Sequence, residues 1–175
     1  DWYHYFGDFQ ANLLVEGFYT KLSDPFVLTP PVKDPDGSAY LIQTRINGSG
    51  AKVYGGTLEG KVAYKDKVQL QAGLTLQRSI YDSPEEWSAD EEHLSEKERY
   101  SDKILRTPDV YGYFTATYMP VKAFSIALNG NYTGRMYVPH LLSKVNGEAD
   151  VLVKSPDFFE LGTKIAYDFD FQGFC

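Results

Sequence analysis

The amino-acid sequence predicts an all-β fold, in the form of an antiparallel, up-and-down segment of a transmembrane β-barrel. Three observations support this prediction. Apolar and polar residues alternate along six separate runs, short and long connections alternate between these runs, and aromatic residues, which make up 15% of the chain, gather near the ends of the runs. An apolar residue at every second position turns one face of a strand toward an apolar environment.

The six alternating runs span residues 9–20, 54–64, 68–77, 110–118, 124–135 and 159–170. The third run is the clearest, because Leu70, Leu74 and Leu76 alternate with Gln, Gly and Thr residues. No 3.6-residue period competes over these spans, so the pattern favours strands throughout. We therefore expect about six strands.

The connections between these runs differ in length. Residues 65–67 and 119–123 make short connections, whereas residues 23–39, 82–108 and 137–157 make long, polar ones. In an up-and-down sheet, this alternation places the short turns at one end and the long connections at the other. Outer-membrane barrels have that asymmetry, and a sandwich with Greek-key crossings does not require it.

Tyrosines lie near the ends of the runs, on or close to the apolar face. A ring with a hydroxyl suits a membrane–water boundary, because the ring is apolar and the hydroxyl reaches water. The opposite face carries amide, hydroxyl and charged residues, which favours a water-filled lumen. The alternative is a soluble β-sandwich binding module, with one face on a core and the other in water. The tyrosines concerned are Tyr19, Tyr54, Tyr64, Tyr118, Tyr132, Tyr137 and Tyr167.

Composition excludes several other classes. The 175-residue chain has a formal net charge of -7, which argues against a nucleic-acid partner, because phosphate binding requires clustered Lys and Arg. No apolar run reaches the roughly 18 residues of a membrane helix. The single cysteine, Cys175, allows no internal disulfide. The chain begins without a secretory signal, and its strands are too few to close around a wet lumen. We therefore expect residues 1–175 to be a fragment of a longer barrel domain.

Four segments, in order, resemble the C-terminal third of the barrel of TonB-dependent outer-membrane receptors. They are residues 12–22, residues 52–60, the Arg-Thr-Pro sequence at 106–108 and the Asn-Gly-Asn-Tyr-Thr-Gly-Arg sequence at 129–135. Thr57 stands where the strand signature of that family has a Glu. The resemblance covers nearly the whole chain. It implies a barrel of about 22 strands around an N-terminal plug, preceded by a TonB-contacting box; neither plug nor box is in this sequence.

The resemblance also implies a function in the cell outer membrane of a Gram-negative bacterium. Receptors of this family carry out energy-coupled uptake of a scarce nutrient, such as an iron chelate (siderophore), haem or cobalamin. The implied partners are outer-membrane lipid, a small chelate or vitamin ligand, and a TonB-type energy-transducing protein reached through the missing N-terminal parts. A plugless, porin-like barrel and the soluble sandwich remain alternatives.

Five polar residues are candidates for contact with a substrate or plug, because the alternation turns them toward the lumen. They are Glu59, Lys61, Asn129, Asn131 and Arg135. We expect no catalytic residues, because His140, the only histidine inside or beside a strand pattern, has no well-placed Ser or Asp partner. An enzyme is therefore not expected, nor is a cofactor.

A metal site is not expected either. His4, His93 and His140 lack the spacing of metal ligands, which argues against haem ligation. The acidic segment from Asp82 to Asp102 lacks the fixed glycine of an EF-hand, so a solvated loop is favoured over a Ca²⁺ site. The acidic residues of this segment are Asp82, Glu85, Glu86, Asp90, Glu91, Glu92, Glu96, Glu98 and Asp102.

Overall fold

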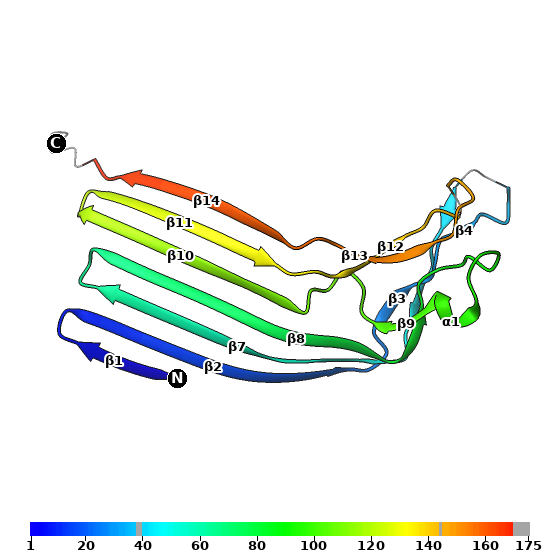
Figure 1. Ribbon diagram of the computed structural model, residues 1–175, viewed down its shortest axis with the longest axis horizontal. Helices are drawn as coiled ribbons and strands as arrows, with labels where there is room; N and C mark the ends of the chain where they lie inside the picture. The colour runs from blue at the N-terminus through cyan, green and yellow to red at the C-terminus, as the bar shows by residue number, and fades with distance from the viewer. Residues whose placement is uncertain (38–39, 144, 170–175) are drawn as a thin grey trace, which may run out of the picture.

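The computed structural model describes residues 1–37, 40–143 and 145–169 of the chain (Figure 1). Three positions named in the sequence predictions, Ala39, Asp170 and Cys175, lie outside the described residues. Within the described part, the helix α1 (Glu96–Arg99) is a single turn, and no helix is long and apolar enough to cross a membrane.

Seven strands lie side by side in one antiparallel sheet, in the order β1-β2-β7-β8-β10-β11-β14. An eighth strand, β9, pairs with β8. These seven strands follow one another across the sheet in the same order as along the chain, with the strands of other small sheets between some of them. The sheet is therefore a simple meander. The all-β, antiparallel prediction is confirmed. The strands are β1 (Trp2–Phe6), β2 (Phe9–Leu22), β7 (Ala51–Tyr64), β8 (Val68–Glu86), β9 (Tyr100–Lys103), β10 (Val110–Val121), β11 (Phe124–Thr133) and β14 (Phe158–Tyr167).

The sequence predicts six strands of this meander and misses β1. Aromatic residues and His4 fill nearly every position of β1, so apolar and polar residues do not alternate there. Its pairing with β2, from Trp2 opposite Leu13 to Phe6 opposite Phe9, places Trp2, His4 and Phe6 on the same face as the apolar residues of β2. The run at 124–135 also ends earlier than predicted, because β11 stops at Thr133.

The connections divide between the two ends of the sheet (Figure 1). Tight turns at Gly7-Asp8, residues 65–67 and residues 122–123 lie at one end, on the left of the figure. Two of these turns are tied together, because the Lys65 amide donates to the Asp8 carbonyl at 3.0 Å and the Lys65 ammonium lies 3.0 Å from the Asp8 carboxylate. The long connections lie at the other end, as the sequence predicts.

We call residues 23–50, 82–109 and 134–157 the cap. These ranges comprise the long connections together with β9 and the last five residues of β8. The sequence predicts them only as polar connections, but the structure shows small two-stranded sheets within them. The cap strands pair as β3 with β6, β4 with β5 and β12 with β13. Their bounds are β3 (Phe26–Leu28), β4 (Val32–Lys33), β5 (Leu41–Ile42), β6 (Arg45–Asn47), β12 (Tyr137–His140) and β13 (Val151–Lys154).

We call the seven-strand meander the wall. It is an open sheet whose two edges are β1 and β14, and the described strands form no closed barrel. It also has no conventional core: Ala51 and Trp87 are the buried hydrophobic residues of the described chain. A soluble domain of this size normally buries many more. What covers the apolar side chains of the wall is therefore the main functional question.

Candidate functional site

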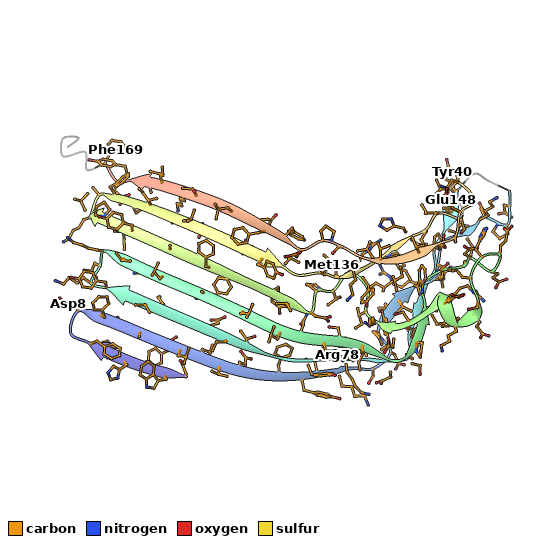
Figure 2. All side chains as sticks on the ribbon, in the orientation of Figure 1. Asp8, Tyr40, Arg78, Met136, Glu148 and Phe169 are labelled. Carbon is orange, nitrogen blue, oxygen red and sulfur yellow. The ribbon has the colours of Figure 1, made fainter. Side chains whose placement is uncertain are left out.

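One face of the wall is apolar across its middle strands. The strand register brings the apolar members of each alternating run into line; one such row is Ala11, Val62, Leu70, Ala116 and Leu128, and it ends in His4 on β1 and Thr163 on β14. Large side chains on this face are exposed, including Val15 at 69%, Leu161 at 62% and Ile165 at 66%. Figure 2 shows side chains projecting along the whole length of the sheet, with no second layer drawn over it. The face is a surface without a protein partner in the described chain.

Aromatic residues border this apolar face at both ends. At the tight-turn end, Phe9 is opposite Tyr64 with ring centroids 4.6 Å apart, and Phe124 is opposite Tyr167 at 6.5 Å. At the cap end, Tyr19 is opposite Tyr54. Tyr132 of β11 is opposite Phe159 of β14 at the cap end of these two strands. The apolar residues therefore occupy a band between two aromatic borders.

The opposite face of the wall is polar, and its side chains interact with one another. The hydroxyls of Thr57 and Thr75 are 3.0 Å apart across β7 and β8. The Gln71 amide donates to the Tyr113 hydroxyl at 2.9 Å across β8 and β10. The Tyr113 ring covers Gly73, where an added Cβ would lie 2.5 Å from the ring. Each of these contacts joins two neighbouring strands, and we call this middle part of the polar face the polar belt.

Four of the five candidate residues lie on this polar face, in two neighbouring rows that cross the sheet. Lys61 shares a row with Gln71 and Asn129, and Glu59 shares the next row with Tyr113 and Asn131. Two strands separate β7 from β11, so the Glu59 and Lys61 pair is about 14 Å from the asparagines at the usual strand spacing. The four residues form part of one polar belt but no compact cluster.

Arg135 is not part of that belt. It lies past the end of β11, in the connection to β12, with 69% of its side chain exposed. Its guanidinium Nε is 3.7 Å from the Asp157 carboxylate. The period-two pattern places Arg135 on the lumen face only if the strand continues through Gly134, and the strand does not.

The cap has a small buried core made of polar groups. The Ser88 hydroxyl donates to Asp150 at 2.6 Å, and the Asp150 amide donates to the Asp90 carboxylate at 3.0 Å. The Ser143 amide donates to the other Asp150 oxygen at 2.8 Å. Ser88, Asp90 and Asp150 are at most 3% exposed. This network, which we call the cap knot, ties the connection between β8 and β10 to the connection between β11 and β14.

His93 completes the cap knot from its edge. Its Nδ1 is 2.9 Å from an Asp90 carboxylate oxygen, and this hydrogen bond raises the pKa of the imidazole. Burial raises the pKa of the Asp90 carboxyl, but hydrogen bonds from the Asp150 amide and from His93 outweigh it, so this pKa lies below its ordinary value. The pair is therefore held in its charged form, with Asp90 ionised and His93 protonated over a widened pH range.

The acidic segment from Asp82 to Asp102 is thus a solvated loop only in part. Asp82 is 2.5 Å from Lys52, and Glu85 accepts the Ser49 amide at 2.7 Å. Arg99 bridges Glu86 at 2.6 Å and Glu91 at 3.3 Å. The prediction of a solvated segment is wrong at Trp87 and Asp90, because both are buried: the Trp87 indole donates to the Glu98 carbonyl, and Asp90 accepts the Asp150 amide.

The histidines and acids of the described chain form no group of three or more that could hold a metal ion. His4 stacks against Trp2 in β1, and His140 lies opposite Val151 in the cap. The Ser88 hydroxyl is fully buried and donates to a carboxylate, so it is not presented as a nucleophile. The Ser88, His93 and Asp90 arrangement holds the cap together.

A cavity of about 690 Å³ opens at the rim, where the cap meets the wall. Its lining includes four basic side chains, Arg78, Lys103, Arg135 and Lys154, and two carboxylates, Asp109 and Asp157. At its side, the Lys103 ammonium is 3.1 Å from the Tyr137 hydroxyl and 4.3 Å from the centre of the Tyr137 ring. We call it the rim cavity. Of its six charged residues, the sequence analysis identified only Arg135, because the others come from separate segments that no motif connects.

Comparisons with protein-family models, with curated proteins and with solved structures find no match to this chain.

Proposed function

We propose that this chain forms part of the wall of a transmembrane β-barrel in an outer membrane, with its apolar face toward lipid and its polar face toward a water-filled lumen. The observation that supports this most directly is the apolar band that crosses the middle strands of the wall between two aromatic borders. Ten residue steps separate Tyr54 from Tyr64, or roughly 33 Å along a strand. At the usual strand tilt of about 35–45°, this corresponds to a band about 25 Å tall, as outer-membrane barrels have.

The exposure of this band requires an apolar partner. Leu58, Leu70 and Leu74 are 45–51% exposed, and they belong to one continuous surface. Covering a large aliphatic side chain is worth about 1.5–3 kcal/mol. Soluble monomers rarely expose so extended an apolar patch. Lipid chains supply that cover without any further protein element.

A soluble β-sandwich is the rival interpretation, and the arrangement of the sheets disfavours it. A sandwich needs a second sheet packed face to face on the first, about 10 Å away. In the described chain, the additional sheets are short and lie at the cap end (Figure 1). They leave the apolar face of the wall uncovered.

The open edges of the wall are the next feature to explain. β1 and β14 each have one side without a strand partner in the described chain. A membrane barrel satisfies every backbone group between strands, because lipid offers no hydrogen bonds. We propose that further strands pair with β1 and β14 and close the barrel.

The family resemblance supports a more specific proposal. The chain would belong to a TonB-dependent receptor for energy-coupled uptake of an iron chelate, haem or cobalamin. Glu59, Lys61, Asn129 and Asn131 would then face the plug or the ligand path, on the polar side of the wall. A porin-like barrel shares the same wall and differs in what fills the lumen. The long, structured cap favours the receptor, because such connections gather a ligand outside the cell.

The orientation of the wall can be tested with two neighbouring residues of β2 that project to opposite faces. Val15 lies opposite Leu58 on the apolar face, and Glu16 lies opposite Thr57 on the polar face. We would make Val15→Trp and Glu16→Trp in the complete barrel-forming protein that contains this chain, in vesicles of phosphatidylcholine brominated on its acyl chains. Quenching is taken as the difference from the unsubstituted protein, so that the contributions of Trp2 and Trp87 cancel. Bromine quenches a tryptophan that touches lipid. We expect strong quenching of Val15→Trp and little of Glu16→Trp.

Three outcomes would count against the barrel. Equal quenching of the two variants would remove the distinction between the faces. Quenching of neither, with a folded and soluble protein in the absence of detergent, would favour the sandwich. Preferential quenching of Glu16→Trp would reverse the assignment of the faces.

A further inference from the structure

We propose that the rim cavity binds a phosphate monoester group, which an outer-leaflet lipid headgroup or a soluble phosphate could supply. The location of the cavity at the membrane boundary rests on the proposed function; its chemistry rests on its own side chains. Four basic residues line the cavity against two carboxylates. The chain as a whole has a net charge of -7, so this local excess of positive charge is opposite to the general charge of the molecule.

Three of the four basic groups of the cavity, Arg78, Lys103 and Lys154, have no carboxylate partner in the described chain, whereas Arg135 is paired with Asp157. Within the described chain, the Arg78 side chain makes no hydrogen bond and no ion pair. Lys103 contacts the Tyr137 hydroxyl and ring, and the Lys154 ammonium lies 5.3 Å from the centre of the same ring. Neither contact removes positive charge. The effect is visible on Tyr137, whose pKa is lowered by its hydrogen bond with Lys103.

The two carboxylates leave this excess in place. Asp157 is already engaged, because the Tyr132 hydroxyl donates to it at 3.3 Å and Arg135 lies 3.7 Å from it. The Asp109 carboxylate has no ion-pair partner in the described chain, and four basic groups against two carboxylates still leave the cavity a net charge of +2. Arg78, Lys103 and Lys154 therefore remain as three cationic donors from three different elements, β8, β9 and β13.

A phosphate monoester fits this set of donors better than a carboxylate does. It presents up to three strong acceptor oxygens and a charge of about -1.5 to -2. Arg binds phosphate through its planar fork, and Lys binds it as a point charge. Donors from three separate elements suit an anion with several oxygens, whereas a carboxylate offers only two.

The position of the cavity connects it to the lipid surface. Arg78 lies opposite Tyr54 in the strand register, so it is on the apolar face, one alternate position beyond Leu76. Tyr132 belongs both to the aromatic border and to the cavity lining. The cavity therefore begins where the apolar band ends, which is the level of lipid headgroups in a membrane barrel. Basic pockets at this level bind anionic headgroups.

The test measures binding by phosphorus NMR, with the folded protein in detergent micelles. Three probes are titrated: diphosphoryl lipid A, inorganic phosphate and phosphatidylcholine. Arg78→Gln and Lys154→Gln each remove one cavity charge, and the matched control Lys21→Gln removes one charge at the same rim, outside the cavity lining. We expect lipid A to bind and each cavity variant to weaken binding by about tenfold, as for a charge-assisted hydrogen bond. The control should change it less than twofold.

The probes separate the two sources of phosphate. Tight binding of lipid A with weak binding of inorganic phosphate assigns the site to a lipid headgroup. Equal binding of inorganic phosphate, lost in the same two variants, supports the site and assigns it to a soluble phosphate. The proposal is overturned if neither phosphate probe binds, if phosphatidylcholine binds as tightly as they do, or if Lys21→Gln weakens binding as much as the cavity variants.

The phosphate-binding experiment and the quenching experiment test the two proposals separately. Loss of phosphate binding with correct quenching of Val15→Trp would refute the rim cavity and keep the barrel. Phosphate binding without a difference between Val15→Trp and Glu16→Trp would keep the cavity and refute the barrel.

Discussion

The wall and the cap solve the problem of stability in opposite ways. The wall turns its large apolar side chains outward and is held together by long antiparallel ladders, such as the pairing of β7 with β8 from Ala51 opposite Tyr81 to Tyr64 opposite Val68. The cap buries polar groups instead, with Ser88, Asp90 and Asp150 at its centre. In the proposed barrel, lipid covers the apolar face of the wall, whereas the buried acids of the cap, Asp90 and Asp150, are hydrogen-bonded by groups of the cap itself.

This difference explains why burial alone is a poor guide to the molecule. In the wall, exposure of Leu and Ile in the isolated chain marks the surface that the proposed function assigns to lipid. In the cap, Asp90 and Asp150 can be buried because both are hydrogen-bonded. A charged side chain on the apolar face should therefore destabilise the wall. A change in the protonation of His93 or Asp90 should affect the stability of the cap alone.

The largest expected effect is that of a charge on the apolar face. Leu128 lies midway between Phe124 and Tyr132 on β11, and Asn129 beside it projects to the polar face. Leu128→Arg should destabilise the protein in vesicles by about 2–4 kcal/mol, as for Arg at a bilayer midplane. Asn129→Arg should change stability by less than about 1 kcal/mol. Urea titration in vesicles measures both, and equal losses for the two variants would contradict the assignment of the faces.

A smaller effect is expected from close backbone approach in β7. A Cβ added at Gly55 would meet the Leu76 carbonyl oxygen of β8 and would lie 2.9 Å from the Phe18 ring, whereas Gly60 has no heavy atom within 4 Å of such a Cβ. Gly55→Ala should therefore cost about 1–3 kcal/mol through overpacking. Gly60→Ala should be neutral or stabilising by up to about 1 kcal/mol. The same titration tests the pair, and a harmless Gly55→Ala would show that the two strands separate more easily than the structure implies.

The sequence predicts most of the wall because strand periodicity is a local property. Six of the seven meander strands, the two faces and the short turns can be inferred from residues such as Val68 to Gln77, where each neighbour along the chain belongs to the opposite face. Periodicity does not predict β1, because its aromatic residues occupy both faces of the strand. Arg135 was placed on the lumen face because periodicity alone does not show that β11 ends at Thr133.

The cap and the rim cavity could not be predicted because they depend on contacts between distant segments. Asp90 has the sequence context of a solvated acid, and one of the hydrogen bonds that accompany its burial comes from the Asp150 amide, far along the chain. Arg78, Lys103 and Lys154 share no motif. One local indication was present: Arg78 follows Leu74 and Leu76 at alternate positions, so a charge interrupts the apolar face where the band ends.

The smallest expected effect is the pH dependence of the cap knot. The pKa of His93 is raised in the folded protein, so its contribution is fully present below the ordinary value near 6.5 and is lost as pH rises through the raised pKa. The pKa of Asp90 is lowered, so its contribution is present above the ordinary value near 3.9 and is lost as pH falls through the lowered pKa. The cap should therefore be most stable between about pH 4 and pH 6.5.

Amide hydrogen exchange of residues 87–99 measures this dependence, with the wild type compared with His93→Gln at each pH so that intrinsic exchange rates cancel. Between pH 6 and pH 8, the protection of the wild type relative to this variant should fall by no more than about tenfold, because one partly exposed pair is involved. His140→Gln is the matched control, since His140 lies outside the knot, and it should keep the full pH dependence. Wall amides should not respond. If the ratio of amide protection between wild type and His93→Gln stays constant across this range, His93 contributes only packing. The wall and the cap would then differ in which residues they bury, and the charge of His93 would not stabilise the cap.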